Sequence, residues 1–354
     1  MRKLETGTIK TLCYIGDLPD RRIDGITTSF NRNLSILSDN FKIINTPENS
    51  FLKTGPIKKI ITVLSFWNNT RRFINDKNPE VCYINLPTSF WGLFKQFVLL
   101  ILIQNKSLVV VFHVHRGDFL ERIQSSWVYK LLANRIIKRV EKVIVLSPME
   151  GAKLNETFKT KAFYSLTNTI DAPNFNSKID RAGFLYVSNY LESKGIFDLL
   201  EVFTALKEEG VRLECYGDFP NNEYKERLFK YASPFISING PVVGAAKYKV
   251  MQKAKCLILP SRSEGQPLVI LEAMSQGLPV IATDVGFVKE LLGEDNGYYI
   301  PANNKEALKK VILEVSKNRE MSVHGDCLQK RYKEKFNPSA HKKQLFEIFK
   351  PFIS

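Results

Sequence analysis

The chain has 354 residues, which is more than one typical domain and suits two of similar size. Its 44% apolar and 25% charged residues are ordinary for a soluble globular protein, and it has no repeat or low-complexity tract, so fibrous and repeat architectures are excluded. The formal net charge is +15, and residues 1–180 hold 26 Lys and Arg against 15 Asp and Glu. We therefore expect an acidic partner for the first half, with a merely soluble basic surface as the alternative.

Short apolar runs alternate with helical stretches through the first half of the chain. The runs have the composition of parallel strands that are buried on both faces: TLCYIG, FKIINT, VCYINL, LVVVFHV, KVIVLS and AFYSL. The segments 27–37, 57–74, 89–103 and 126–139 predict helices between them. Residues 97–103, FVLLILI, are too short to span a bilayer, so we expect a core helix there. A helix that dips into a membrane surface is the alternative.

At the end of the fourth apolar run the sequence HVHRGDF places His113 and His115 two residues apart. In a strand this spacing puts both side chains on one face. A single histidine there is about as often a hydrogen-bonded structural residue as a functional one. Two histidines at the carboxyl end of a strand in a doubly wound sheet favour function, and no third ligand is placed to suggest a metal.

A polar segment at residues 168–183, NTIDAPNFNSKIDRAG, has the composition of a linker. After it the alternation of strands and helices restarts with GFLYVS, RLECYG, FISI and CLILP. The chain is therefore predicted to have an α/β fold with two Rossmann-like domains, over residues 1–170 and 171–335. Residues 336–354 carry an apolar stripe at helical spacing and predict a terminal helix. In the simplest interpretation this helix caps the domain that precedes it.

The most informative stretch is Leu259–Thr283, which contains Glu264 and Glu272. Glu264 stands in the loop after an apolar strand, and Glu272 lies in an otherwise apolar helix. A buried helix does not hold a lone charge without a partner, because desolvation costs several kcal/mol, so Glu272 should face a polar group such as a sugar hydroxyl. Pro267 suits the start of this helix, and Gly277 suits the position after its end. The loop before the helix offers backbone N–H groups to a phosphate.

This segment resembles the signature of glycosyltransferase family 4, whose two glutamates have the same spacing. The resemblance continues downstream through DVGFVKELL and NGYYIP. It implies a GT-B fold, in which the parallel sheets of two Rossmann-like domains face a central cleft and the terminal helix at 336–354 crosses back to the first domain. It also implies a retaining, nucleotide-sugar-dependent enzyme. In the family, the first glutamate lies by the donor sugar and the second holds the ribose.

The same resemblance assigns further site residues. The stretch SNYLESKG resembles the one in which an Arg and a Lys bind the donor diphosphate; Lys194 matches the Lys, whereas Asn189 stands where Arg is usual and can donate only without charge. His115 aligns with the family's site histidine, with His113 as the alternative. The predicted catalytic residues are Glu264, His115 and Lys194. The predicted donor-binding residues are Asn189, Lys194, Gly265, Gln266, Pro267, Leu268, Glu272 and Gly25.

The resulting hypothesis is a hexosyltransferase-type enzyme that moves a sugar from a UDP- or GDP-sugar to a hydroxyl of a glycan or lipid-linked acceptor, in cell-surface polysaccharide biosynthesis. The alternatives are a nucleotide-sugar epimerase on the same fold and a degenerate, nucleotide-sugar-binding partner of another transferase. No Asp-x-Asp pair and no early GxGxxG occur, so neither a metal nor a dinucleotide cofactor is expected.

The partners expected besides the donor and acceptor follow from the charge. An anionic membrane surface suits the basic first half, and we expect the protein in the cytoplasm, peripheral at the inner face of the plasma membrane. Nucleic acid is not expected as a partner, because the aromatic residues are not interleaved with the basic ones as a stacking platform requires.

Overall fold

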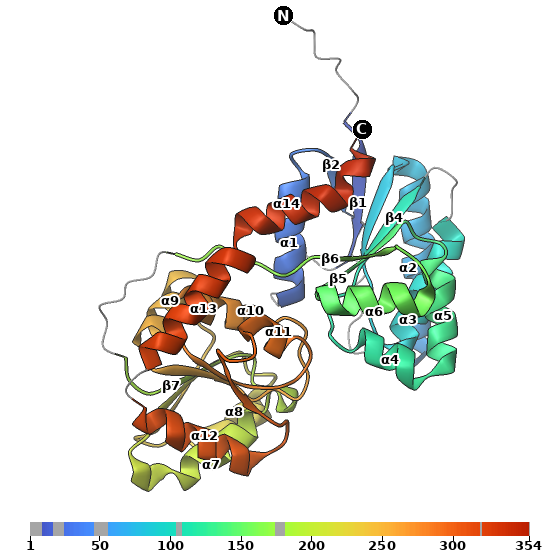
Figure 1. Cartoon of the computed structure of the whole chain (residues 1–354). Coiled ribbons are helices and arrows are strands. Elements are labelled where there is room, and N and C mark those ends of the chain that lie inside the picture. The colour runs from blue at the N-terminus through green and yellow to red at the C-terminus, as the bar shows by residue number, and fades with distance from the viewer. Residues whose placement is uncertain are drawn as a thin grey trace, which may run out of the picture. The chain divides into compact units, whose positions relative to one another are not determined.

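The computed structural model describes residues 9–16, 25–45, 56–103, 108–173, 181–318 and 321–353. The chain forms two compact units, one of Met1–Thr167 with His341–Ser354 and one of Asn168–Ala340. Each unit has a six-stranded parallel sheet with helices on both faces (Figure 1). Of the predicted linker at 168–183, residues 174–180 lie outside the described residues.

The first unit has the strand order β2-β1-β3-β4-β5-β6, and every neighbouring pair is parallel. Each of the six apolar runs of the first half contains one strand, which confirms those predictions. The strands are β1 (Thr11–Ile15), β2 (Lys42–Asn45), β3 (Val81–Asn85), β4 (Val109–His113), β5 (Lys142–Val145) and β6 (Phe163–Ser165).

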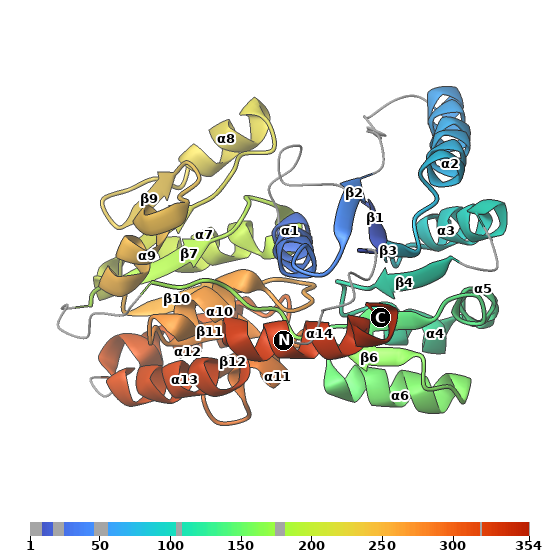
Figure 2. The ribbon, with the colours of Figure 1, turned by 90° about the horizontal axis from the view of Figure 1, so that it is seen from above.

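The strands of the first unit bury alternate side chains in two separate cores, as period-two alternation requires. Cys13, Ile84 and Phe112 pack on one face, against residues of α2 to α6. Tyr14 and Tyr83 pack on the other face with residues of α1 and α14. Figure 2 shows α1 and α14 on the side of this sheet opposite to α2, α3 and α5. These helices are α1 (Gly25–Leu37), α2 (Pro56–Lys77), α3 (Phe90–Ile103), α4 (Phe119–Ser125), α5 (Trp127–Ile137), α6 (Pro148–Phe158) and α14 (Pro338–Phe349).

The helix expected over residues 126–139 is shorter than predicted and follows a separate helix, α4. The side chain of Ser126 caps α5 by accepting a hydrogen bond from the backbone N–H of Tyr129, and its own backbone is extended, so the two helices cannot be continuous. The apolar run at 97–103 lies in α3, whose buried residues include Leu99 and Ile103, as expected of a core helix. Within the described ranges, no helix combines the length and hydropathy that a bilayer span needs.

The second unit has the order β12-β11-β10-β7-β8-β9, again all parallel. The chain builds outward from β7 on one side, then returns to place β10 on its other side. In doubly wound sheets, ligands bind beyond the carboxyl ends of the strands at this reversal. The strands are β7 (Phe184–Val187), β8 (Leu213–Tyr216), β9 (Ile236–Asn239), β10 (Cys256–Leu259), β11 (Val280–Thr283) and β12 (Tyr298–Ile300).

Helices again cover both faces of the second sheet. Residues of α7 and α12 share one core with Phe184 and Ile258, and residues of α9, α10, α11 and α13 share the other with Leu185 and Leu257. Figure 1 shows α7 and α12 on one side of this sheet and α10 and α13 on the other. The helices are α7 (Ile196–Ala205), α8 (Asn222–Phe229), α9 (Gly244–Lys253), α10 (Leu268–Ser275), α11 (Val288–Leu292), α12 (Lys305–Lys317) and α13 (Met321–Lys335).

A close backbone approach locks the ends of β7 and β10 together. Gly195 begins α7 with φ +70°, and a Cβ added there would run into the carbonyl oxygen of Pro260, the residue after β10. Only glycine tolerates both the left-handed backbone and this proximity. The segment that follows β7 is therefore held against the segment that follows β10.

We predict that Gly195→Ala destabilises the second unit much more than Gly210→Ala. Gly210 has φ +69° but nothing within 4 Å of an added Cβ, so it is a matched control for backbone strain alone. The control Gly210→Ala should lower the free energy of unfolding by about 1 kcal/mol. The collision at Gly195 should lower it by a further ~1–3 kcal/mol. Urea unfolding of both variants measures the difference, and equal losses of stability would contradict the close approach.

Candidate active site

The reversal point of the second sheet brings two of the predicted catalytic residues together. Lys194 ends a short 3-10 helix (Glu192–Lys194) after β7, and Glu264 lies in the loop after β10. The Lys194 Nζ lies 2.7 Å from Glu264 Oε1, a charge-assisted hydrogen bond between residues 70 positions apart. The Glu264 side chain is only 8% exposed and that of Lys194 25% exposed, so the pair lies largely out of water. Lys194 thus pairs with the Glu264 carboxylate at the edge where ligands bind in doubly wound sheets.

The loop between β10 and α10, residues 260–267, contains Glu264 and is called the acidic loop. Its backbone is fixed from both sides. Gly286 has φ +57°, and an added Cβ would run into the carbonyl oxygen of Glu264. The Phe287 N–H donates to the Gly265 carbonyl oxygen at 3.1 Å, and the Arg262 N–H donates to the Ser193 carbonyl oxygen at 2.8 Å. Because the loop is held at these points, the Glu264 carboxylate is presented in a defined position.

Glu272 lies in the second turn of α10, and its partner is Lys247 of α9. The Lys247 Nζ lies 2.5 Å from Glu272 Oε1, and the two side chains are 22% and 10% exposed. The expectation that Glu272 faces a polar group is confirmed, although the group is a lysine of the protein. No sequence motif marks Lys247; α9 reads as a basic helix with a short apolar face, and only packing against α10 selects this lysine.

The amino end of α10 lies directly after the acidic loop. No side chain caps its first N–H groups, so they and the positive end of the helix dipole are suited to a phosphate. Pro267 immediately precedes the helix and has no backbone N–H. It therefore cannot donate a hydrogen bond to a phosphate, although it is among the predicted donor-binding residues. Leu268 is the first helical residue.

Two other predicted donor-binding residues have contacts within the second unit. Gln266 is buried, its Oε1 accepting from the Asn168 N–H at 2.8 Å and its carbonyl oxygen accepting from Asn168 Nδ2 at 3.0 Å. This contact ties the acidic loop to the segment that opens the unit. Asn189 is exposed after β7, and its carbonyl oxygen accepts from the Tyr186 hydroxyl at 3.1 Å. The roles of both residues toward a donor stay predictions.

In the first unit the rings of the two predicted histidines lie close together at the end of β4, tilted by 33°. The ring centroids of His113 and His115 are 3.9 Å apart, and Phe30 of α1 packs 4.7 Å from the His115 ring. The Tyr83 hydroxyl lies 2.6 Å from His113 Nδ1 and accepts from Asn33 Nδ2 at 3.0 Å. If the Tyr83 hydroxyl donates to His113 Nδ1, the proton of the neutral ring lies on Nε2.

A third histidine joins this network from α14. His341 Nδ1 lies 2.7 Å from the Thr167 carbonyl oxygen, and its Nε2 lies 2.7 Å from Asn33 Oδ1. Asn33 thus connects α14 with Tyr83 and, through it, with β4. No sequence motif marks Asn33, Tyr83 or His341, because positions 33, 83 and 341 meet only in the folded unit.

Burial and neighbouring charge keep His113 and His115 neutral. Desolvation lowers the pKa of His113 well below its usual value, and the nearby His115 and His341 lower it further. Desolvation, with His341, lowers the pKa of His115 to about 3. The Nε2 atoms of both rings are buried without a hydrogen-bond partner among the described residues. Each neutral imidazole has one ring nitrogen that could donate a hydrogen bond to a hydroxyl group or accept one from it.

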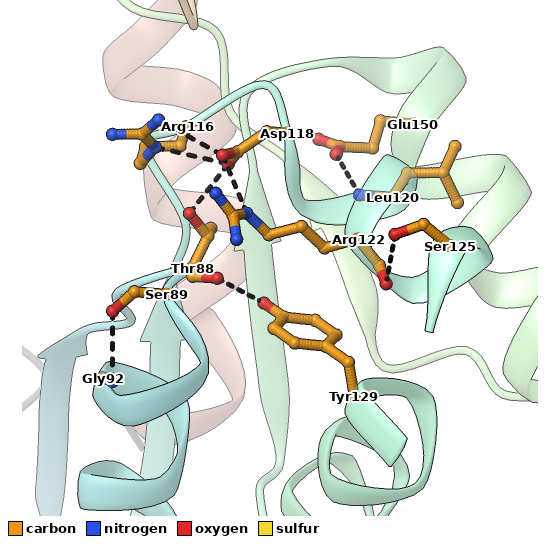
Figure 3. A network of polar contacts seen from close by, with 10 residues as sticks. All are labelled: Thr88, Ser89, Gly92, Arg116, Asp118, Leu120, Arg122, Ser125, Tyr129 and Glu150. Atoms are coloured by element: carbon orange, nitrogen blue, oxygen red, sulfur yellow. Dashed lines mark hydrogen bonds and ion pairs between the residues drawn. The ribbon is translucent and has the colours of Figure 1, made fainter. Parts of the chain in front are cut away.

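A polar network surrounds Asp118 in the loop after β4 (Figure 3). Asp118 accepts from Thr88 Oγ1 at 2.7 Å, from Arg122 Nε at 2.9 Å and from Arg116 Nε at 3.3 Å. Burial would raise the pKa of Asp118, but these hydrogen bonds outweigh it and hold the pKa below its usual value. The Tyr129 hydroxyl donates to the Thr88 carbonyl oxygen at 2.8 Å, so the ends of β3 and β4 are joined to α5.

The remaining predicted elements of the site are less defined. Gly25 begins α1 and is exposed, whereas residues 17–24 before it lie outside the described residues. Its role toward phosphate or acceptor stays a prediction. In the described part of the chain, no group of three or more His, Cys, Asp and Glu side chains is placed to hold a metal ion.

Comparisons with known proteins point to one enzyme class. Residues 181–318, which include β7 to β12, match the family model described as glycosyl transferases group 1. An uncharacterized glycosyltransferase of Methanocaldococcus jannaschii is 28% identical over 56% of this chain and 56% of its own length. A poly(ribitol-phosphate) α-N-acetylglucosaminyltransferase of Staphylococcus aureus is 20% identical over 96% of this chain and 67% of its own length. The chain spans about half the length of curated relatives such as the first.

Solved structures identify the fold. Sucrose-phosphate synthase of Thermosynechococcus elongatus superposes with a TM-score of 0.76 at 18% identity, over 97% of this chain and 99% of that chain. HepE of Anabaena, solved in complex with UDP-glucose, gives a TM-score of 0.69 at 14% identity, over 97% and 100%. The chain therefore has the α/β GT-B fold, with two parallel six-stranded sheets flanked by helices, as predicted.

We predict that Lys247→Met lowers the free energy of unfolding by about 3 kcal/mol, because it leaves the Glu272 carboxylate in a buried site without its cation. The double variant Lys247→Met/Glu272→Gln should recover much of this loss, since no buried charge remains. Chemical denaturation of the wild type, Lys247→Met, Glu272→Gln and the double variant gives the coupling energy. Additive losses in the double variant would contradict a direct ion pair.

We predict that the first unit loses stability as the pH falls below about 6.5. The unfolded histidines bind protons near that pH, whereas folded His113 and His115 do so only at much lower pH, so the unfolded state gains protons first. Each histidine should remove about 1 kcal/mol between about pH 6.5 and 5.5. Urea unfolding at both pH values tests this, and His115→Gln should reduce the pH dependence by about half. A pH-independent unfolding free energy would contradict neutral burial.

Proposed function

We propose that this chain is a glycosyltransferase of family 4 that uses a UDP- or GDP-sugar and transfers the sugar to a hydroxyl with retention and without a metal. The observation that carries the proposal is the pair of lysine-held carboxylates, Glu264 with Lys194 and Glu272 with Lys247, on either side of the uncapped amino end of α10. This arrangement lies within the segment that matches group 1 glycosyl transferases. Paired carboxylates beside a phosphate-binding helix end suit an activated sugar.

The proposed roles follow from the charge that develops as the donor breaks down. A departing nucleotide diphosphate gains negative charge, and the Lys194 ammonium with the first N–H groups of α10 can stabilise it. Glu264 would hold sugar hydroxyls and stabilise the oxocarbenium-like ring. Glu272 would accept hydrogen bonds from the ribose. His115 would act as a neutral hydrogen-bonding group toward the sugar or the incoming hydroxyl, with His113 as the alternative.

We propose a glycan or lipid-linked acceptor in cell-surface polysaccharide biosynthesis, and a cytoplasmic protein peripheral to the membrane. The support is the relative named for poly(ribitol-phosphate) and the basic first half. The degenerate-partner alternative has one specific observation in its favour, which is that the exposed Asn189 brings no charge to the diphosphate. Lys194 remains as the cation of that segment.

We predict that Glu264→Ala lowers the rate of sugar transfer by about 10²-fold or more without weakening nucleotide binding. Glu272→Ala should instead weaken nucleotide binding by about 10-fold or more, because it removes the charged carboxylate that accepts hydrogen bonds from the ribose. Calorimetric titration with UDP and GDP measures binding, and product formation from their sugars measures transfer.

The exposed Glu306 of α12 supplies the matched control Glu306→Ala, which should change neither quantity. Unchanged turnover in Glu264→Ala would remove the proposed role of that residue. Nucleotide binding by the wild type without transfer to any acceptor would favour the degenerate partner, and an isomerised sugar formed without an acceptor would favour an epimerase.

A further inference from the structure

An apolar surface lies exposed on one side of the first unit. It is formed by side chains of α2, α3 and α5, and we call it the rim patch: Ile60, Ile61, Leu64, Trp91, Phe94, Trp127, Val128 and Leu131. Trp91 and Trp127 are 75% and 78% exposed, and the other six are between 39% and 63% exposed. Large apolar side chains gathered in this way on a soluble unit mark an interaction surface.

The patch follows one edge of the sheet. All eight residues lie in the first half of their helices, and these helices run back from the carboxyl ends of the strands, so the helix starts lie along that edge. The Trp67 indole of α2 donates to the Lys95 carbonyl oxygen of α3, and the Tyr129 hydroxyl of α5 donates to the Thr88 carbonyl oxygen just before α3. The three helices are thus neighbours, as Figure 2 also shows.

The charge of these helices is one-sided. α3 and α5 contain Lys95, Lys130 and Arg135 and no Asp or Glu. The single acidic residue of α2 is Asp76, in the last turn and away from the patch. An apolar surface with tryptophans, on three helices that carry cations and, apart from Asp76, no anion, matches the headgroup region of a bilayer that contains anionic lipids.

A second copy of the chain fits this surface less well. A twofold contact would place the same patch on both copies, and the cations of α3 and α5 would then face each other without an anion on these helices to compensate. A lipid surface supplies the missing negative charge, and its interface suits the exposed indole rings.

We propose that the rim patch docks the first unit on an anionic membrane surface, with Trp91 and Trp127 inserted among the headgroups and Lys130 on lipid phosphates. The same edge of the sheet carries His115 and the Asp118 network, so a lipid-linked hydroxyl would reach it from the bilayer. That purpose rests on the proposed function, whereas the docking itself requires neither donor nor acceptor.

The test is co-sedimentation of the full chain with vesicles of phosphatidylcholine alone or mixed with phosphatidylglycerol at about seven to three. The wild type should bind only the mixed vesicles, with a blue shift of tryptophan fluorescence, and should be released by high salt. Trp91→Ser/Trp127→Ser should bind at least about tenfold less, and Lys130→Ala about fivefold less, which is the factor expected for one basic residue at an anionic surface.

The matched controls are Val243→Ser/Val323→Ser, which removes two exposed apolar side chains of the second unit, and Lys310→Ala of α12. Both should bind vesicles as the wild type does. A wild-type circular dichroism spectrum and unfolding midpoint show that each variant is folded, and calorimetry measures its UDP binding. Equal vesicle binding by the tryptophan variant and its control would overturn the proposal. So would a wild-type dimer in sedimentation that the tryptophan variant abolishes, because the patch would then join two copies. Vesicle binding lost with UDP binding intact leaves the proposed function standing.

Discussion

The reversal of strand order between β7 and β10 is the constraint on which the candidate site depends. It places the segment with Lys194 beside the loop with Glu264, and the contact of Gly195 with Pro260 fixes the two segments together. The cation and the carboxylate neutralise each other at an edge where the backbone N–H groups of α10 also point outward. A diphosphate that reaches Lys194 would compete with Glu264 for the ammonium, and the carboxylate would then become available to the sugar. In the proposed function, donor binding and the presentation of the Glu264 carboxylate would therefore be coupled.

The second carboxylate of the pair, Glu272, is buried, so its charge requires a partner. α10 is apolar around most of its circumference because it lies between the sheet and α13, so Glu272 is held in a place where an uncompensated charge is costly. Lys247 compensates this charge, and the ion pair introduces two charged groups on an otherwise apolar helix surface. Replacing both by apolar side chains would suit packing equally well, so a requirement for the charges other than stability is the natural explanation of their presence.

The first unit builds its site in a different way. Its ionisable groups at the ends of β3 and β4 are either neutral, as are His113 and His115, or matched, as is Asp118 with Arg116 and Arg122. Neutral imidazoles suit contacts with uncharged hydroxyl groups, whereas the second unit pairs Lys194 and Lys247 with carboxylates. The basic excess of the first half lies instead on its surface, where the rim patch adds apolar anchors. The division of chemistry between the units agrees with an acceptor on one and a nucleotide on the other.

The sequence by itself determined the six strands of the first sheet, strands β7 to β10 of the second, the helix that carries Glu272 and the acidic pair, because period, turn residues and buried apolar runs are local properties. It also required a polar partner for Glu272, since the cost of burying a charge does not depend on the partner's identity. Only the tertiary structure decided that the partner is Lys247, that Lys194 pairs with Glu264, and that Asn33, Tyr83 and His341 surround the histidines. These contacts join residues tens to hundreds of positions apart. The exposure of Trp91 on a helix predicted to be core was likewise decided by packing, because an apolar helix has no face that its own residues mark as outward.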